Sequence, residues 1–236
     1  CPTSKVGHRH QIHISLTYMR RSVFAEGEYY HIYNRGVEKR SIFLNDRDRW
    51  RFLTLLLLLQ GEVLVPKISR IVSDVQHWRL DSDIFKEVLA SREVELVCFC
   101  LMGNHYHLIL SEIKEGGISR YMMRLGDSYT KYFNIIHERK GHLFESKFQS
   151  IHIDENNYLR HLSAYIHLNP RDLKSWGGRE HEYPWSSFRS YCGDGRLGDF
   201  INPSIIIDQF RNTDEYVQFV KETRKKDDLP EEYRID

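Results

Sequence analysis

The chain is poor in cysteine and lacks the patterns that cysteine chemistry uses. Its four cysteines are Cys1, Cys98, Cys100 and Cys192, and none forms a Cys-x-x-Cys pair. Cys98 and Cys100 alternate within a strand-like run, which is typical of thiols in a core. This usage excludes a disulfide framework and fits a reducing compartment, so we expect the protein to be cytoplasmic.

Long apolar runs and an excess of charge of one sign are also missing. The longest apolar stretch, Leu53–Leu59, is far too short to cross a bilayer, and no positively charged start leads into a signal-type segment. We therefore expect no membrane partner. Because the net charge is +1, overall charge does not mark a nucleic-acid binder, and such a role has to rest on local patches.

The composition is that of a chain able to build one large domain. It is 41% hydrophobic and 28% charged, which supplies both a core and a polar surface. Residues 1–18 are polar, and Met19 looks like a natural start, so we expect 1–18 to be an extension or a cloning remnant. We expect one domain over 19–192 with an insertion at 61–92, followed by a partly helical C-terminal extension over 193–236.

The hydrophobic pattern predicts the order strand, helix, strand, strand, helix, strand, helix. Aromatic and β-branched runs indicate strands, and apolar residues at helical spacing after capping residues indicate helices. The first six elements match a split β-α-β arrangement, so we predict an α+β fold with a ferredoxin-like antiparallel sheet. Strands are predicted at 29–33, 94–102, 105–110 and 148–153, and helices at about 45–60, 83–90, 118–138, 154–169, 205–210 and 214–223.

The most informative feature is His105-Tyr106-His107, which follows the turn signal Gly103-Asn104 and opens a predicted strand. Side chains two apart on a strand point to the same face, so two imidazoles project together from a rigid element. Such a pair is half of a metal site. The alternative is a pair of histidines that only pack in the core or on the sheet surface.

A second segment, Tyr158–Pro170, favours the metal site. Positions four apart share a helix face, which puts His161, Tyr165 and Asn169 on one stripe. The Asn169 side-chain oxygen can complete the coordination, and a divalent cation would stabilise the phenolate of Tyr165, since the unperturbed pKa of tyrosine is about 10. On periodicity alone, a solvent-exposed polar face is an equally good interpretation. His161 suits a structural role as well as support for Tyr165.

These residues resemble the single-tyrosine HUH transposases, and within them the REP-associated tyrosine transposases. His105–His107 matches the His-hydrophobe-His signature, and Tyr165–Pro170 matches the Tyr-Ile-x-x-Asn-Pro motif. Within the segment Gly141–Phe148, Phe144 and Lys147 stand where the family commonly has tryptophan and arginine. Lysine keeps the positive charge but cannot make the two parallel hydrogen bonds that arginine makes to a phosphate. Further matching segments are His31–Gly36, Gly141–Phe148 and Trp185–Phe188, in the same order, so the resemblance covers about residues 28–192.

The resemblance implies the HUH single-tyrosine transposase fold and a reaction on single-stranded DNA beside a hairpin, carried out by a monomer or homodimer. It implies that His105, His107 and Asn169 hold Mg²⁺ or Mn²⁺, and that Tyr165 forms a 5′-phosphotyrosine. Alternatives remain open: a domesticated hairpin-binding protein that no longer cuts, a metal-dependent phosphodiesterase that uses water, and a replication initiator or plasmid relaxase.

Basic residues suggest where DNA would lie. Residues 117–150 hold six basic and three acidic residues, interleaved with aromatic side chains that can stack on unpaired bases. Much of the aromatic series has helical spacing, which is equally typical of a core. Arg20, Arg21 and Arg35 form a second candidate patch. The predicted DNA-binding residues are Arg35, Arg120, Arg124, Lys131, Arg139, Lys140 and Lys147.

Overall fold

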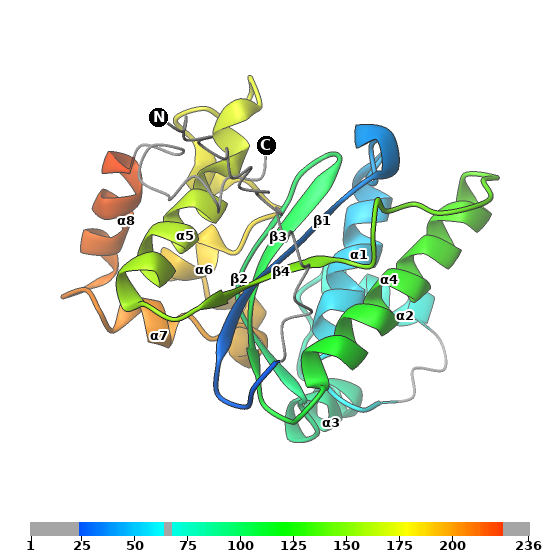
Figure 1. Cartoon of the computed structure of the whole chain (residues 1–236), viewed down its shortest axis with the longest axis horizontal. Coiled ribbons are helices and arrows are strands. Elements are labelled where there is room, and N and C mark those ends of the chain that lie inside the picture. The colour runs from blue at the N-terminus through cyan, green and yellow to red at the C-terminus, as the bar shows by residue number, and fades with distance from the viewer. Residues whose placement is uncertain (1–23, 64–67, 224–236) are drawn as a thin grey trace, which may run out of the picture.

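An antiparallel sheet forms the centre of the computed structural model, which describes residues 24–63 and 68–223 (Figure 1). Across these residues the sheet has four strands in the order β2-β3-β1-β4, and every neighbouring pair is antiparallel. One helical crossover joins β1 to β2 and another joins β3 to β4, so the predicted ferredoxin-like α+β fold is confirmed. The strands are β1 Tyr29–Arg35, β2 Val94–Leu101, β3 His105–Glu112 and β4 Gln149–Ile153.

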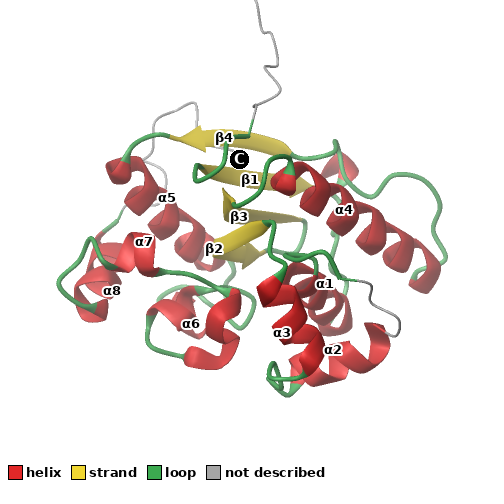
Figure 2. Ribbon diagram, turned by 90° about the horizontal axis from the view of Figure 1, so that it is seen from below, coloured by secondary structure: helices red, strands yellow, loops and turns green. Residues whose placement is uncertain are grey.

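Helices cover both faces of the sheet (Figure 2). On one face, α1 (Asp46–Leu58) packs against α4 (Gly117–Ile136), and on the other α5 (Asn156–Leu168) packs against β2 and β3. The remaining helices are α2 Ile68–Gln76, α3 Asp83–Ala90, α6 Phe188–Tyr191, α7 Ser204–Ile207 and α8 Thr213–Glu222, with 3-10 turns η1 Val37–Lys39, η2 Asn169–Asp172, η3 Glu180–Glu182 and η4 Gly195–Phe200.

The leucine run of the sequence is the buried core of α1. Asn45 caps this helix, since its side chain accepts a hydrogen bond from the Asp48 amide at 3.2 Å. Residues 52–58 are all buried because α1 lies among the sheet, α4 and α2. The ring of Phe52 meets the ring of Tyr106, which belongs to β3, at 5.1 Å between centroids. Tyr106 therefore points toward α1. His105 and His107, which flank it in the strand, point to the opposite face of the sheet, toward α5.

Local features differ from the sequence prediction. Helix α5 begins at Asn156, with Glu155 as its N-cap, instead of at residue 154. Helix α2 was not predicted; it is short, and Ile71 and Val75 are its buried residues. It packs against α1, so this part of 61–92 adds to the core.

The C-terminal segment packs onto the sheet and onto α5. The amide of Leu101 donates to the Trp185 carbonyl at 2.8 Å, and the amide of Asn202 donates to the Leu96 carbonyl at 2.9 Å. Both contacts lie along β2, the edge strand on this side. The described part of the chain holds no helix that is long and apolar enough to cross a bilayer. The predicted extension 1–18 and the end of the tail after 223 lie outside the described residues.

Candidate active site

The candidate site lies where β1 ends and β3 begins. Antiparallel pairing sets Arg35 opposite His105 and Tyr33 opposite His107. Because alternate residues share a face, these four side chains lie on the side of the sheet that α5 covers. The rings of His105 and His107 are 5.1 Å apart between centroids. The pair therefore projects jointly toward α5, as the two-residue spacing predicts.

Helix α5 and the η2 turn that directly follows it bring Tyr165 and Asn169 to this face. They are 1% and 2% exposed, so the solvent-exposed polar stripe is excluded for these two residues. The ring of Tyr165 stands edge-on to His107, with 5.5 Å between centroids. The Asn169 amide nitrogen donates to the Tyr165 carbonyl at 3.0 Å, which turns Oδ1 toward His105 Nε2, 3.4 Å away. The structure thus brings His105, His107, Tyr165 and Asn169 together.

The hydrogen bonds around His105 define its tautomer. Asn104 donates through Nδ2 to the Lys39 carbonyl at 3.1 Å, so its Oδ1 is left as an acceptor, 2.7 Å from His105 Nδ1. His105 Nδ1 must then carry the proton, and in the neutral ring the lone pair is on Nε2. That lone pair faces the Asn169 Oδ1, which is also an acceptor. A cation shared by the two atoms, or a second proton on His105, makes the contact favourable.

His107 is held from the other side by a residue of β1. Its Nδ1 lies 3.1 Å from Nε2 of His31, which is 0% exposed. Burial lowers the pKa of His31 to about 3, so this imidazole is neutral near pH 7. Histidines that bind metals commonly donate the hydrogen of their second ring nitrogen to a neighbouring acceptor. Two imidazoles and an amide oxygen form a donor set that suits Mn²⁺, Mg²⁺ or a later transition metal.

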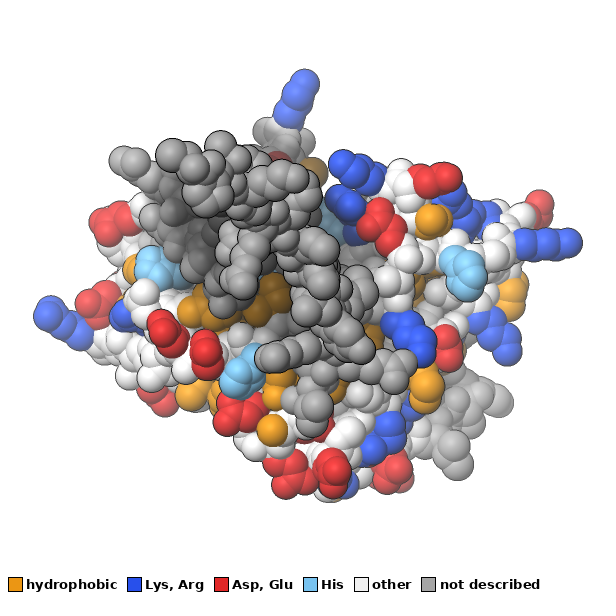
Figure 3. Space-filling model, viewed as in Figure 1, with side chains coloured by type: hydrophobic (Ala, Val, Ile, Leu, Met, Phe, Trp, Pro, Cys, Tyr) orange, Lys and Arg blue, Asp and Glu red, His pale blue; other side chains and the backbone are white. Residues whose placement is uncertain are grey.

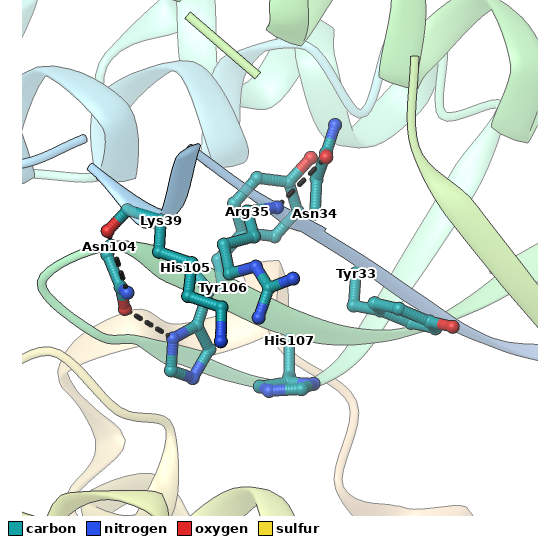
Figure 4. A pocket seen from close by; sticks show the side chains of 8 residues that line it. All are labelled: Tyr33, Asn34, Arg35, Lys39, Asn104, His105, Tyr106 and His107. Carbon is teal, nitrogen blue, oxygen red and sulfur yellow. Dashed lines mark hydrogen bonds between the residues drawn. The ribbon is translucent and has the colours of Figure 1, made fainter. Parts of the chain in front are cut away.

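A cavity of about 230 Å³ opens beside the two imidazoles (Figure 4). Arg35 and Lys39 give it positive charge, and Arg35 also pairs with the exposed Glu145 at 3.2 Å. Glu38 and Lys39 have left-handed φ angles of 56° and 58°, a strained conformation that tends to occur at functional sites. The lining residues are Tyr33, Asn34, Arg35, Lys39, Asn104, His105, Tyr106 and His107.

Two of the arginines predicted to bind DNA are engaged elsewhere. Arg120 and Arg124 of α4 pair with the buried carboxylate of Glu93, at 2.6 and 3.3 Å. Arg124 also donates to the carbonyl oxygens of Leu59 and Gly61. These contacts fasten α4 to the end of α1, on the sheet face opposite α5. The structure gives both side chains a packing role that charge counting along the sequence does not reveal.

The other predicted basic residues divide into two groups. Arg35 lines the cavity. The Lys147 backbone lies next to the cavity, because Asn34, another lining residue, donates from its side chain to the Lys147 carbonyl at 2.8 Å. Lys131, Arg139 and Lys140 lie along the C-terminal half of α4 and just after it. Figure 3 shows Lys and Arg side chains gathered on the right of the molecule, where Figure 1 places η1 and that end of α4.

The interleaved aromatic residues of α4 belong to the core. Tyr121 and Tyr129 are 0% exposed, and their hydroxyls donate to the Leu56 and Ile42 carbonyls. Neither ring is available to stack on a base. His161 lies against the Phe219 ring of α8, with 5.0 Å between centroids. Its predicted support of Tyr165 stays a prediction. Arg20 and Arg21 lie outside the described residues.

Sequence reasoning missed three residues that surround the imidazoles: His31, Lys39 and Asn104. The alternation of His31, Tyr33 and Arg35 along one strand is visible in the sequence and indicates one shared face. What the sequence does not show is that this face carries His107, because the register of β1 on β3 joins residues 76 positions apart.

Comparison with protein families finds a match over part of the chain. Residues 62–169 match the family model described as transposase IS200 like, a stretch that holds His105, His107, Tyr165 and Asn169. The match agrees with the resemblance that the motifs indicate, because this stretch of the chain is similar to the IS200-like transposases. His31 and Lys39 precede the matched stretch.

Among solved structures, the chain is similar to a REP-associated tyrosine transposase described as bound to a REP hairpin. The two share 16% sequence identity with a TM-score of 0.47, over 74% of this chain and 85% of that chain. The search of curated proteins finds no match to this chain.

Proposed function

We propose that the chain is a metal-dependent single-stranded DNA endonuclease and strand transferase that acts at hairpin-associated sites through a 5′-phosphotyrosine. The observation that carries this proposal is the convergence of Tyr165 and Asn169 on the His105–His107 pair. His105 and Asn169 are 64 positions apart in the sequence, yet their Nε2 and Oδ1 atoms lie 3.4 Å apart. The hairpin in the substrate follows from the family resemblance.

The residues present fit a divalent cation. Mg²⁺ or Mn²⁺ would be held by His105, His107 and Asn169, and when bound it would polarise the scissile phosphate and stabilise the phenolate. All three ligands are uncharged, so the full charge of the ion acts on the phosphate. Arg35 and Lys39 extend the positive charge along the cavity, where the neighbouring backbone phosphates would lie.

The chemical step transfers a phosphodiester from DNA to the protein. The Tyr165 phenolate oxygen attacks phosphorus, a Tyr–O–P bond forms, and the bond from phosphorus to the 3′ oxygen breaks. The leaving oxygen takes up a proton and becomes a free 3′-hydroxyl. Attack by another 3′-hydroxyl on the 5′-phosphotyrosine reverses the step and joins two strands. No ATP is needed, because the covalent intermediate conserves the phosphodiester bond.

The test is a denaturing gel of the protein with labelled single-stranded hairpin DNA from its own genomic flanks, in Mn²⁺ or in EDTA. We expect a covalent protein–DNA band in Mn²⁺ that EDTA abolishes. Tyr165→Phe should reduce this band by a factor on the order of 10³ or more, as expected for loss of a covalent nucleophile. Tyr158→Phe is the matched control, because it removes a hydroxyl from the same helix and should leave the band.

Three results would lead to other conclusions. A covalent band that persists in Tyr165→Phe would assign the nucleophile to another residue. Metal-dependent cutting without any covalent band would indicate a phosphodiesterase that uses water. Tight hairpin binding without cutting in any metal would favour the domesticated binding protein.

A further inference from the structure

His31 is a fully buried histidine that contacts His107, a proposed metal ligand. It stands on β1, two residues before Tyr33, the residue that pairs with His107 across the sheet. Its ring lies nearly parallel to that of His107, at 24° and 5.3 Å between centroids, with Nε2 at 3.1 Å from His107 Nδ1. The contact is a single hydrogen bond between two imidazoles.

One proton in this bond decides whether His107 can bind a cation. If His31 Nε2 donates the proton, His107 Nδ1 accepts it, and neutral His107 then carries its own proton on Nε2, where a metal would bind. If His107 Nδ1 donates instead, its Nε2 keeps a lone pair for the metal. The second arrangement requires His31 to present a lone pair on Nε2.

The proposed metal site requires the arrangement in which His31 accepts. The other histidine of the pair, His105, already has its Nδ1 proton fixed by Asn104, which leaves Nε2 toward Asn169. In that arrangement His31 takes the same part beside His107 that Asn104 takes beside His105, as the acceptor from Nδ1. Both imidazoles are then directed so that their Nε2 atoms are ligands, and each is held by an uncharged acceptor instead of the common carboxylate.

We infer that His31 is a positioning residue that holds His107 in the tautomer able to bind the divalent ion. This inference rests on the proposed metal-dependent function, and assigns a part of it to β1, which precedes the stretch that matches the transposase family model. His31 acts through His107, and no atom of the DNA is expected to reach it, since it is 0% exposed.

Mn²⁺ affinity tests the inference without any turnover. Mn²⁺ is titrated into the Tyr165→Phe protein, in which no DNA is cut, and free Mn²⁺ is followed by electron paramagnetic resonance. We expect His31→Leu, which removes the acceptor, to weaken Mn²⁺ binding about 10- to 100-fold. His31→Gln should stay close to the parent, because a glutamine oxygen can take the place of Nε2. Nitrogen-15 NMR should show His107 protonated on Nδ1 in the parent and His31→Gln, and on Nε2 in a larger share of His31→Leu.

The outcomes separate the inference from the proposal beneath it. If the parent binds Mn²⁺ and His31→Leu, shown to be folded by circular dichroism, binds it equally well, the inference is wrong while the metal site stands. If His31→Gln loses affinity as much as His31→Leu, the residue does not act as an acceptor and the inference is also wrong. If His105→Ala and His107→Ala bind Mn²⁺ as the parent does, the proposed metal site itself fails.

Discussion

Lys39 contributes to the cavity twice, through different atoms. Its ammonium group lines the cavity beside His105, while its backbone carbonyl accepts the hydrogen bond from the Asn104 side chain. Asn104 in turn fixes the proton of His105. The left-handed backbone of Lys39 is therefore tied to the orientation of His105, a proposed metal ligand, and its side chain lies at the cavity where the proposed DNA substrate would bind.

Changing only the Lys39 side chain should affect DNA binding and leave the metal site intact. We expect Lys39→Gln to weaken binding of single-stranded DNA and to reduce the slope of log K against log salt by about 0.7, the share of one phosphate contact. Fluorescence anisotropy over a range of salt concentrations measures both effects. Mn²⁺ affinity should not change.

Lys114→Gln is the matched control for this charge. Lys114 is exposed and follows the far end of β3, away from His105. It should leave the salt slope unchanged. If Lys114→Gln lowers the slope and Lys39→Gln does not, the DNA path does not run through the cavity.

At the scale of elements, α5 is fastened by His167, which stands two positions after Tyr165. His167 Nδ1 lies 2.7 Å from the Tyr216 hydroxyl of α8, and its Nε2 lies 2.9 Å from the Ser187 hydroxyl. Tyr216 also donates to Ser163 at 3.1 Å, and all of these groups are buried. The C-terminal segment thus holds the helix that carries Tyr165.

Tyr216→Phe tests this attachment. The change removes one hydroxyl and leaves His167 and Ser163 with buried polar atoms that lose a hydrogen bond. We expect the free energy of unfolding to fall by about 1–3 kcal/mol, as measured by urea denaturation at pH 7. An unchanged free energy of unfolding would show that the hydroxyl does not hold α5 in place.

Helices, strands and the site residues that they carry could be predicted where the pattern lies within one short stretch of sequence. The spacing of His105 and His107 and the four-residue spacing of Tyr165 and Asn169 are sequence properties, and the strand and helix that carry them follow from periodicity. The roles of Arg120 and Arg124 were not predictable, because the partner Glu93 is 27 and 31 positions away. A sequence shows how many charges a stretch holds, but the fold decides which of them pair.

At the scale of the whole molecule, the buried His167 makes stability depend on pH. Burial lowers the pKa of His167 from 6.5 to about 3. In the unfolded chain this residue takes up a proton near pH 6.5, whereas the folded protein stays neutral there until about pH 3. Its contribution to stability is therefore complete above pH 6.5 and falls by about 1.4 kcal/mol for each pH unit below that, down to about pH 3.

Denaturation at two pH values measures this effect. We expect the free energy of unfolding to be about 2 kcal/mol lower at pH 5 than at pH 7 on account of His167. His167→Gln keeps a neutral polar group at the position and should lose that part of the difference. A pH dependence equal to that of the wild type in His167→Gln would assign the acid sensitivity to other groups.

The burial of Tyr165 has a consequence for how such an enzyme would behave while it is idle. Tyr165 is 1% exposed, so its hydroxyl cannot contact a phosphate until α5, or the residues packed over Tyr165, move. The cutting rate would then be proportional to the fraction of molecules in the open state. A DNA strand whose binding does not favour the open state would stay uncut. In a transposase of the kind proposed, burial of the nucleophile would prevent cutting of the single strands that a host genome exposes by chance during replication.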